Sequence, residues 1–375
     1  MSGRTASVAV PAPLARGKKA AYNRIAGADR LRFAALITIV AFHVLLRSAQ
    51  IEARAGLPSS GLEDALIGGA TLFDNRSLAI LSLYLLLIRH RDRSVTETLT
   101  ERANRLLVPY VAWTVAYALL DLSLAIFAGQ PKEMLRAMGD PSYWVEGLVF
   151  ATTTPHLHFL STLFLLTLLL PLARAPLPMA LGIALLCVAA ALRTLLEALF
   201  IPQGLPAAAG PAILAPLMAG RLIESLPTGF LAARLALGPV ITVHARVSAG
   251  VGALMSIAAT MLLPTDVFAP VGQAGAPLGW MLAQAVLGTL AMTLAAIALL
   301  SGPEGRPSKN SIAGWFAPLA FGVFLVNPFI NDAFDIVVPL RTGPEMLAMR
   351  FVIVLVTSTL IARILSKSRR FARFV

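Results

Sequence analysis

The sequence predicts an all-α, polytopic membrane protein with about ten transmembrane helices. Composition is the first observation: of 375 residues, 57% are hydrophobic and 13% are charged, whereas about 25% are charged in a soluble globular protein. The second is that apolar runs reach the roughly 20 residues that a spanning helix needs. These runs are continuous rather than alternating, which argues against an outer-membrane barrel. An ordinary cytosolic enzyme, a disordered protein and a nucleic-acid-binding domain are excluded.

The chain is predicted to have one membrane domain, residues 29–366, between two basic tails. Residues 1–28 are rich in Ala, Pro and basic groups and are predicted to be a disordered cytoplasmic tail, and residues 367–375 form the second tail. Asp74, Asn75 and Arg76 interrupt the second predicted span, and Arg221, Glu224 and Pro227 lie inside the sixth. The predicted spans are 31–48, 67–88, 106–128, 157–173, 177–199, 212–235, 248–268, 278–300, 313–331 and 345–365.

The distribution of basic residues predicts that both termini are cytoplasmic. The net charge is +12, and with the N-terminus inside, 22 of the 31 Lys and Arg residues fall in cytoplasmic segments and 5 in the opposite loops. Cytoplasmic loops of membrane proteins are enriched in Lys and Arg. This bias also explains the positive charge without a nucleic-acid partner.

Arg32 and His43 lie on one face of the first predicted helix. They are eleven positions apart, which is about 20° past three full turns and roughly 16 Å along the axis. The spacing suits an anionic cofactor that enters from the cytoplasm with its reactive end toward the histidine. In the alternative interpretation, Arg32 is a positive-inside anchor and His43 a hydrogen-bonded core histidine.

Further polar residues are candidates for binding sites. Arg102 and Arg105 share a helical face at the cytoplasmic surface, where they can bind phosphate or remain a solvated basic face. Asp74 and Arg76 form either an ion pair at the outer interface or a wall of a polar pocket. His156 and His158 are two apart and point to different sides of a helix, so they do not make a metal site by themselves.

Other chemistry is not indicated. The sequence has no metal-ligand cluster, no phosphate-binding P-loop, no dinucleotide fingerprint, no nucleophile elbow and no zinc-protease motif. Cys187 is the single cysteine, and nothing near it in the sequence would lower its pKa to make it a nucleophile.

Four motifs, taken in order, resemble those of the acyltransferase 3 family of integral membrane acyltransferases. They are RFAALITIVAFH (Arg32 to His43), the R-x-x-R of Arg102 and Arg105 before LLVPYVAW, HLHFLSTLFLLTLLLPLAR, and LAFGVFLVNPFI. The resemblance spans residues 30 to about 365. The sequence departs from the family's motifs at three positions: it has His158 in place of Trp, Asn327 in place of the His before Pro328, and Leu83 in place of a Gly. They concern the acceptor pocket more than the chemistry.

The resemblance implies transfer of an acetyl or succinyl group from acyl-CoA, a co-substrate and not a permanently bound cofactor, to a sugar hydroxyl. The acceptor would be a surface polysaccharide or its lipid-linked precursor, as in the exopolysaccharide branch of the family, and the location the bacterial inner membrane. His43 would be the base, Arg32 would hold a CoA phosphate or position the thioester, and Arg102 and Arg105 would bind CoA phosphates. The implied acceptor residues are Asp74, Arg76, His156, His158 and Asn327.

Two alternatives remain open from the sequence. A transporter or flippase for a glycan or lipid intermediate would also use buried Arg, Asp and His, although no internal repeat of the kind common in transporters is evident. A degenerate family member would bind a glycan without transferring an acyl group. Acyl-CoA binding separates the enzyme from the transporter.

Overall fold

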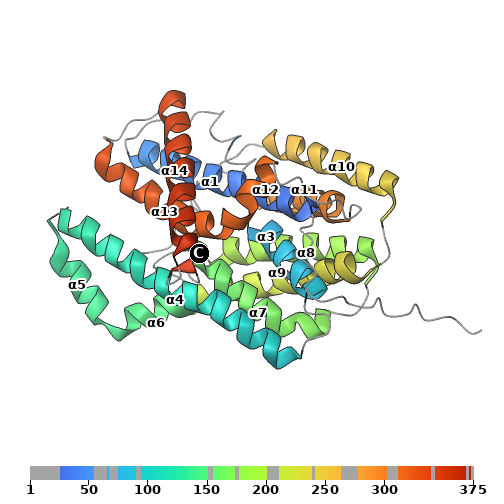
Figure 1. The fold of residues 1–375 in the computed structure, drawn as a ribbon, viewed down its shortest axis with the longest axis horizontal. Helices are drawn as coiled ribbons and strands as arrows, with labels where there is room; N and C mark the ends of the chain where they lie inside the picture. Colours follow the sequence, from blue (N-terminus) through green and yellow to red (C-terminus); the bar gives the residue numbers. More distant parts are fainter. Residues whose placement is uncertain are drawn as a thin grey trace, which may run out of the picture.

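Each of the ten predicted spans overlaps a helix in the computed structural model (Figure 1). The structure describes residues 26–54, 66, 75–89, 94–127, 129–150, 155–173, 177–200, 211–238, 241–262, 278–301, 311–338, 343–368 and 371–372. The regular elements are α1 (Ala26–Arg54), α3 (Asn75–Arg89), α4 (Val95–Phe127), α5 (Pro131–Gly139), α6 (Pro141–Phe150), η1 (Pro155–Leu157), α7 (His158–Ala173), α8 (Met179–Phe200), α9 (Pro211–Leu237), α10 (Val243–Met261), α11 (Leu278–Leu300), α12 (Ile312–Phe316), η2 (Ala317–Leu319), α13 (Ala320–Val337) and α14 (Pro344–Lys367).

The apolar helices identify a multi-pass membrane protein. Within the described ranges, 6 segments are long and apolar enough to cross a bilayer, and two shorter helices are also apolar. The count of ten spans stays a prediction. The 6 segments are Ala26–Glu52, Val95–Phe127, Met179–Leu196, Leu278–Leu300, Ile312–Asp335 and Pro344–Lys367.

Helix α4 begins well before the predicted span at residue 106. Ser94 caps its N-terminus: the Ser94 hydroxyl accepts the Glu97 N–H, and the Glu97 carboxylate accepts the Ser94 N–H, which is a capping box. The helix has 33 residues and is therefore about 50 Å long, more than the roughly 30 Å hydrocarbon core. Its N-terminal part, with Arg102 and Arg105, can thus extend to the membrane surface.

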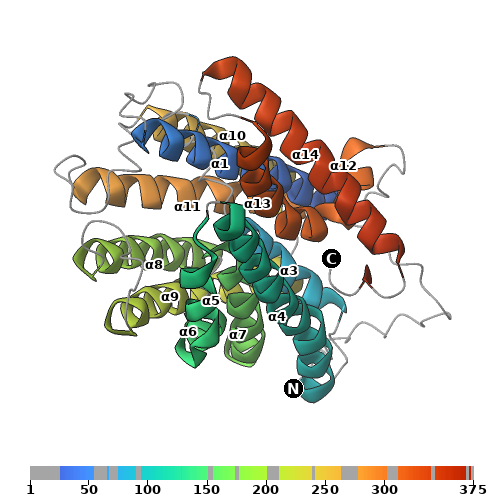
Figure 2. The same ribbon diagram turned by 90° about the vertical axis from the view of Figure 1, so that its left-hand side faces the viewer.

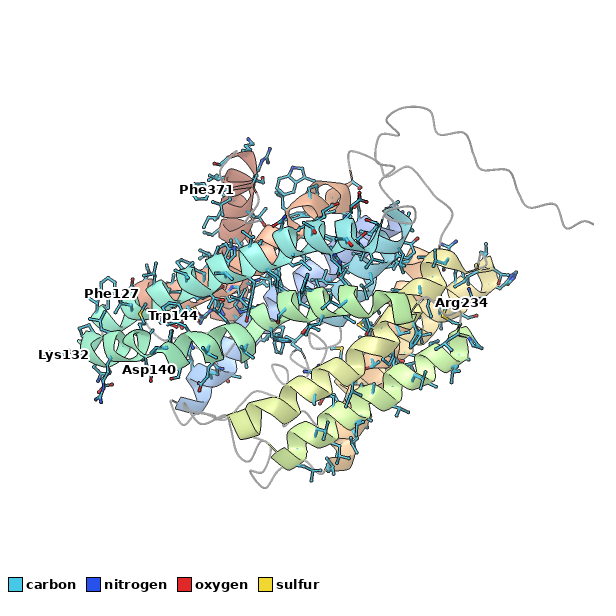
Figure 3. The ribbon with its side chains drawn as sticks, turned by 90° about the horizontal axis from the view of Figure 1, so that it is seen from below. Phe127, Lys132, Asp140, Trp144, Arg234 and Phe371 are labelled. Carbon is cyan, nitrogen blue, oxygen red and sulfur yellow. The ribbon has the colours of Figure 1, made fainter. Side chains whose placement is uncertain are left out.

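Two short helices, α5 and α6, follow α4 where the sequence predicts only a loop. Each has a proline at its first position, where the missing N–H costs nothing. They project beside the end of α4 (Figure 1). Lys132, Asp140 and Trp144 lie at one end of the molecule and Arg234 at the other (Figure 3). The placement of the loop around Lys132 and the loop after Arg234 on opposite sides of the membrane stays a prediction.

Helices α1 and α13 pack side by side and run in the same direction (Figure 2). Residues early in α1 contact residues early in the α12–α13 segment, and later residues contact later ones. The ring of Phe33 packs on Phe316 just before α13, and Arg47, near the other end of α1, pairs with Asp335. Two parallel spanning helices need an odd number of crossings between them. The seven predicted spans between α1 and α13 meet this condition.

The start of α1 is held tightly against the end of α11. A side-chain carbon at Gly27 would overlap the backbone carbonyl of Leu299. The Tyr84 hydroxyl of α3 donates to the Leu300 carbonyl at 3.2 Å, so the end of α11 joins α3 as well. This junction fixes the first turns of α1, including Asp29 and Arg32.

Gly27→Ala should therefore destabilise the fold. The added methyl meets backbone, which has no rotamer into which to move, and overpacking of this kind costs about 1–3 kcal/mol. The measurement is thermal unfolding of the purified protein in detergent. Gly182→Ala is the matched control, because a side chain there meets nothing within 4 Å. Equal melting temperatures for the two variants would contradict the tight α1–α11 junction.

Candidate functional site

A cavity of about 340 Å³ lies among α1, α3, α4, α7 and the η2–α13 segment. Its charged lining comes from the first turns of α1 and α4, and its aromatic lining from α7 and α13. Arg32, Arg102 and Arg105, which the sequence singled out separately, meet here. The charged and aromatic lining residues are Asp29, Arg32, Glu101, Arg102, Arg105, Phe159, Phe321 and Phe324.

Two of the three arginines of this cavity are anchored by neighbouring side chains. Arg32 donates to the Asp29 carboxylate at 3.3 Å, and Arg102 donates to the Ser82 hydroxyl at 2.7 Å. Arg102 is only 7% exposed, and its Nε has no hydrogen-bond partner among the described residues. Arg105, one turn later, is exposed. A buried guanidinium with an unused donor is suited to binding an anion.

His43 lies outside the cavity lining and is paired with Asn327 of α13. The two side chains meet at 2.6 Å between His43 Nδ1 and Asn327 Oδ1. The Asn327 amide nitrogen donates to the carbonyls of Val323 and Phe324, both at 3.0 Å, so its oxygen must face the histidine. His43 Nδ1 therefore carries the proton, and the Nε2 lone pair is left to accept one.

Pro328 interrupts α13 beside this pair, and side chains repair the interruption. Pro328 has no N–H, and the Phe324 carbonyl that it would bond accepts from Asn327 instead. The Tyr117 hydroxyl of α4 accepts the Phe329 N–H and donates to the Leu325 carbonyl, both at 3.0 Å. Those two backbone groups pair with each other in an uninterrupted helix. Tyr117 thus joins α4 to α13 at the histidine.

His156 completes the group around His43. Its ring lies 5.7 Å from that of His43, 5.1 Å from Tyr117 and 5.9 Å from Phe324, all edge to face. Phe324 also lines the arginine cavity, so its ring connects the cavity lining to His156, which in turn contacts His43. The buried His156 Nε2 has no hydrogen-bond partner within the ranges that the structure covers.

An ion-pair network supports His43 from its other side. Asp335 binds Arg47 and Arg350, each at 2.6 Å. Arg350 also donates to the side-chain and backbone oxygens of Asn331, at 2.7 and 2.8 Å. Asn331 in turn donates to the His43 backbone carbonyl at 2.9 Å. The network joins α1, α13 and α14 immediately beyond the histidine.

Comparison with known protein families identifies the family of this chain. The family described as an acyltransferase domain, acyltransferase 3, matches residues 25–367. The chain belongs to the acyltransferase 3 family. No curated protein and no solved structure matches it. Membership makes the protein a membrane acyltransferase, and the match covers every described helix of the bundle.

The structure places the other predicted residues of this acyltransferase as follows. Asn327 contacts His43, and the ring of His156 also lies against His43. His158 opens α7 and is half-buried. Asp74 lies outside the described residues, and Arg76 is in the first turn of α3 with a side chain that is not described.

Sequence reasoning missed Ser82, Tyr117, Asn331 and Asp335. Ser82 directly precedes Leu83, the position where the sequence lacks the family's glycine, and that departure alone did not mark the serine. Tyr117 and Asn331 act across contacts between distant segments, so no local pattern marks them. Asp335 follows a predicted span, and an acidic residue there is ordinary. Its importance comes from two arginines that approach it from α1 and α14.

Asp335→Asn should destabilise the bundle, because it leaves Arg350, whose side chain is 5% exposed, without its carboxylate. Removing one partner of a buried ion pair costs about 3–5 kcal/mol. The readout is the melting temperature in detergent, with Glu133→Gln on exposed α5 as the control. A double change, Asp335→Leu with Arg350→Met, should recover part of the loss. An unshifted melting temperature for Asp335→Asn would contradict the network.

Proposed function

We propose that the protein transfers an acyl group from acyl-CoA to a sugar hydroxyl of a surface polysaccharide or its lipid-linked precursor. One observation carries the proposal: a cavity lined by three arginines reaches Phe324. The ring of Phe324 contacts His156, which in turn contacts His43 of the His43–Asn327 pair. An anion-binding site and an oriented base are the two parts that such a transfer needs.

The arginine cavity fits the donor. CoA carries its phosphates at one end and the thioester at the other, joined by the flexible pantetheine arm. Arg102 and Arg105 can form charge-assisted hydrogen bonds with the phosphates, and Arg32 lies at the start of the helix that holds His43. About 16 Å of α1 separates Arg32 from His43, a distance that an extended pantetheine arm can cover.

The His43–Asn327 pair fits the chemistry. His43 Nε2 would accept the proton of the sugar hydroxyl while that oxygen attacks the thioester carbonyl carbon. The tetrahedral intermediate then collapses, the carbon–sulfur bond breaks, and the CoA sulfur leaves and takes the proton from the imidazolium. Asn327 holds the tautomer that makes Nε2 the acceptor, so it takes the place of the family's usual histidine as a positioning residue.

An uncharged acyl group fits the surroundings of His43 better than a succinyl group. The described neighbours are aromatic rings and the Asn327 amide. The nearby Arg47 and Arg350 are both bound by Asp335. Burying the free carboxylate of succinate without a cation is costly. We therefore propose acetyl-CoA as the donor.

The proposal is tested by the ester content of the host's surface polysaccharide. Proton NMR before and after mild alkali compares wild type with a deletion strain, complemented with the wild-type gene, His43→Ala or His244→Ala. Acetyl signals should vanish in the deletion strain and return with the wild-type gene. They should also return with His244→Ala, the control, which changes an exposed residue. They should stay absent with His43→Ala. Purified His43→Ala should still bind acyl-CoA.

Other results would overturn the proposal. Persistent esters together with a failure of polysaccharide to reach the surface would make the protein a transporter or flippase. Restored esters with His43→Ala would remove His43 as the base. Loss of succinyl rather than acetyl signals would retain the transferase but overturn the donor assignment.

Arg102→Ala and Arg105→Ala should weaken acyl-CoA binding. Each removes charged hydrogen bonds to phosphate that are worth about 1.5–3 kcal/mol, so the dissociation constant should rise about 10- to 100-fold. Isothermal titration in detergent with acetyl-CoA measures this, and Arg136→Ala on exposed α5 is the control. Unchanged affinity in both variants would place the phosphates elsewhere.

A further inference from the structure

We infer that His156 donates, through Nε2–H, the hydrogen bond that stabilises the negative charge on the thioester carbonyl oxygen during transfer. The inference rests on the proposed function, because it concerns the same reaction centre. It assigns His156 to the transferred group, whereas the sequence grouped this residue with the acceptor side.

The position of His156 supports this role. Its ring is in contact range of three residues that bound the reaction centre: His43, the proposed base, Tyr117 and Phe324. Phe324 is also part of the arginine cavity wall. Because His156 contacts both this wall residue and His43, a thioester that extends from the cavity to His43 would lie next to His156.

The unpaired nitrogen points to a missing partner. The Nε2 atom of His156 is closed to solvent and has no hydrogen-bond partner in the part of the chain that the structure describes. Leaving a buried polar atom unpaired costs about 1–3 kcal/mol. The neighbouring rings of Tyr117 and Phe324 meet His156 edge to face and hold the imidazole in place. A substrate atom that pairs with Nε2 removes that cost.

His43 is hydrogen-bonded to Asn327, whereas His156 is held by ring contacts and its Nε2 is unpaired among the described residues. This difference assigns them separate roles, as base and as hydrogen-bond donor. Asn327 fixes His43 as a proton acceptor at Nε2. When His43 takes the hydroxyl proton it becomes a cation, and a second imidazolium with its centre 5.7 Å away would be repelled. His156 therefore stays neutral, and a neutral imidazole can act as a hydrogen-bond donor to a developing oxyanion.

The step balances without any further reactant. The hydroxyl oxygen bonds to the carbonyl carbon, its proton goes to His43, and the carbonyl π electrons move to oxygen, where His156 Nε2–H binds them. Collapse returns those electrons to the carbonyl, breaks the carbon–sulfur bond and releases the thiol with the proton from His43. His156 keeps its own proton throughout.

The test compares His156→Phe with His156→Gln in purified enzyme. Phe keeps an aromatic ring for the three edge-to-face contacts but has no donor, whereas Gln supplies an N–H near the position of Nε2. Loss of one oxyanion donor lowers kcat about 10²- to 10³-fold. We expect this loss for Phe with an unchanged KM for acetyl-CoA and an unchanged pH profile, and a kcat that is largely restored in Gln.

A substrate change makes the test specific. Replacing the carbonyl oxygen of acetyl-CoA by sulfur gives a dithioester, which is a poorer hydrogen-bond acceptor. The replacement should slow wild type far more than His156→Phe, whose donor is already absent. If the role of His156 were purely structural, the ratio of the rate with acetyl-CoA to the rate with the dithioester would be the same in wild type and in His156→Phe. Melting temperatures in detergent identify a variant that fails to fold.

The outcomes separate this inference from the proposed function. If wild type transfers no acetyl group to any sugar acceptor, the proposed function fails. If wild type is active and His156→Phe retains its kcat, or raises only the KM for the acceptor, the proposed function stands and the assignment of His156 is overturned.

Discussion

The fold around the candidate site depends on one constraint: lipid cannot satisfy a backbone polar group. Pro328 interrupts the hydrogen bonding of α13 at the level of His43. The backbone groups left without their helical partners must therefore be paired within the protein. The Asn327 amide donates to the Phe324 carbonyl. The Tyr117 hydroxyl donates to the Leu325 carbonyl and accepts the Phe329 N–H. The amide group that repairs the helix also orients the histidine. The proline interruption and the arrangement of the reaction centre therefore have a common physical cause.

The site consists of two parts with opposite electrostatic character, arranged along α1. Arginines from α1 and α4 line the first part, which is the proposed anion-binding site. The second part is aromatic and neutral and contains the two histidines. Low polarity strengthens the hydrogen bonds of this part, such as that between His43 and Asn327. Beyond it, Asp335 pairs with both Arg47 and Arg350, so charged groups lie on either side of the neutral centre.

The sequence was sufficient for the features that have a local signature. Apolar runs located the helices that the predicted spans overlap. The Arg32-to-His43 spacing and the R-x-x-R motif located residues that the structure places around one cavity and one histidine. The short helices α5 and α6 were missed because, at 9 and 10 residues, they are too short to span a membrane, although each has an N-terminal proline as a signal. The capping box at Ser94 was also visible and explains why α4 begins early. The roles of Tyr117 and Asn331 depend on contacts across 212 and 288 positions, which no local pattern contains.

The pairing of α1 with α13 has a consequence for the order of biogenesis. The bond from His43 to Asn327 joins residues 284 positions apart, and α13 is synthesised near the end of the chain. Until that helix inserts, α1 remains in the membrane with His43 and Arg47 lacking their native partners, which is costly in lipid. The last helices to leave the ribosome therefore complete the first one, and a chain truncated before α13 would contain the arginine cavity only in part and no assembled reaction centre.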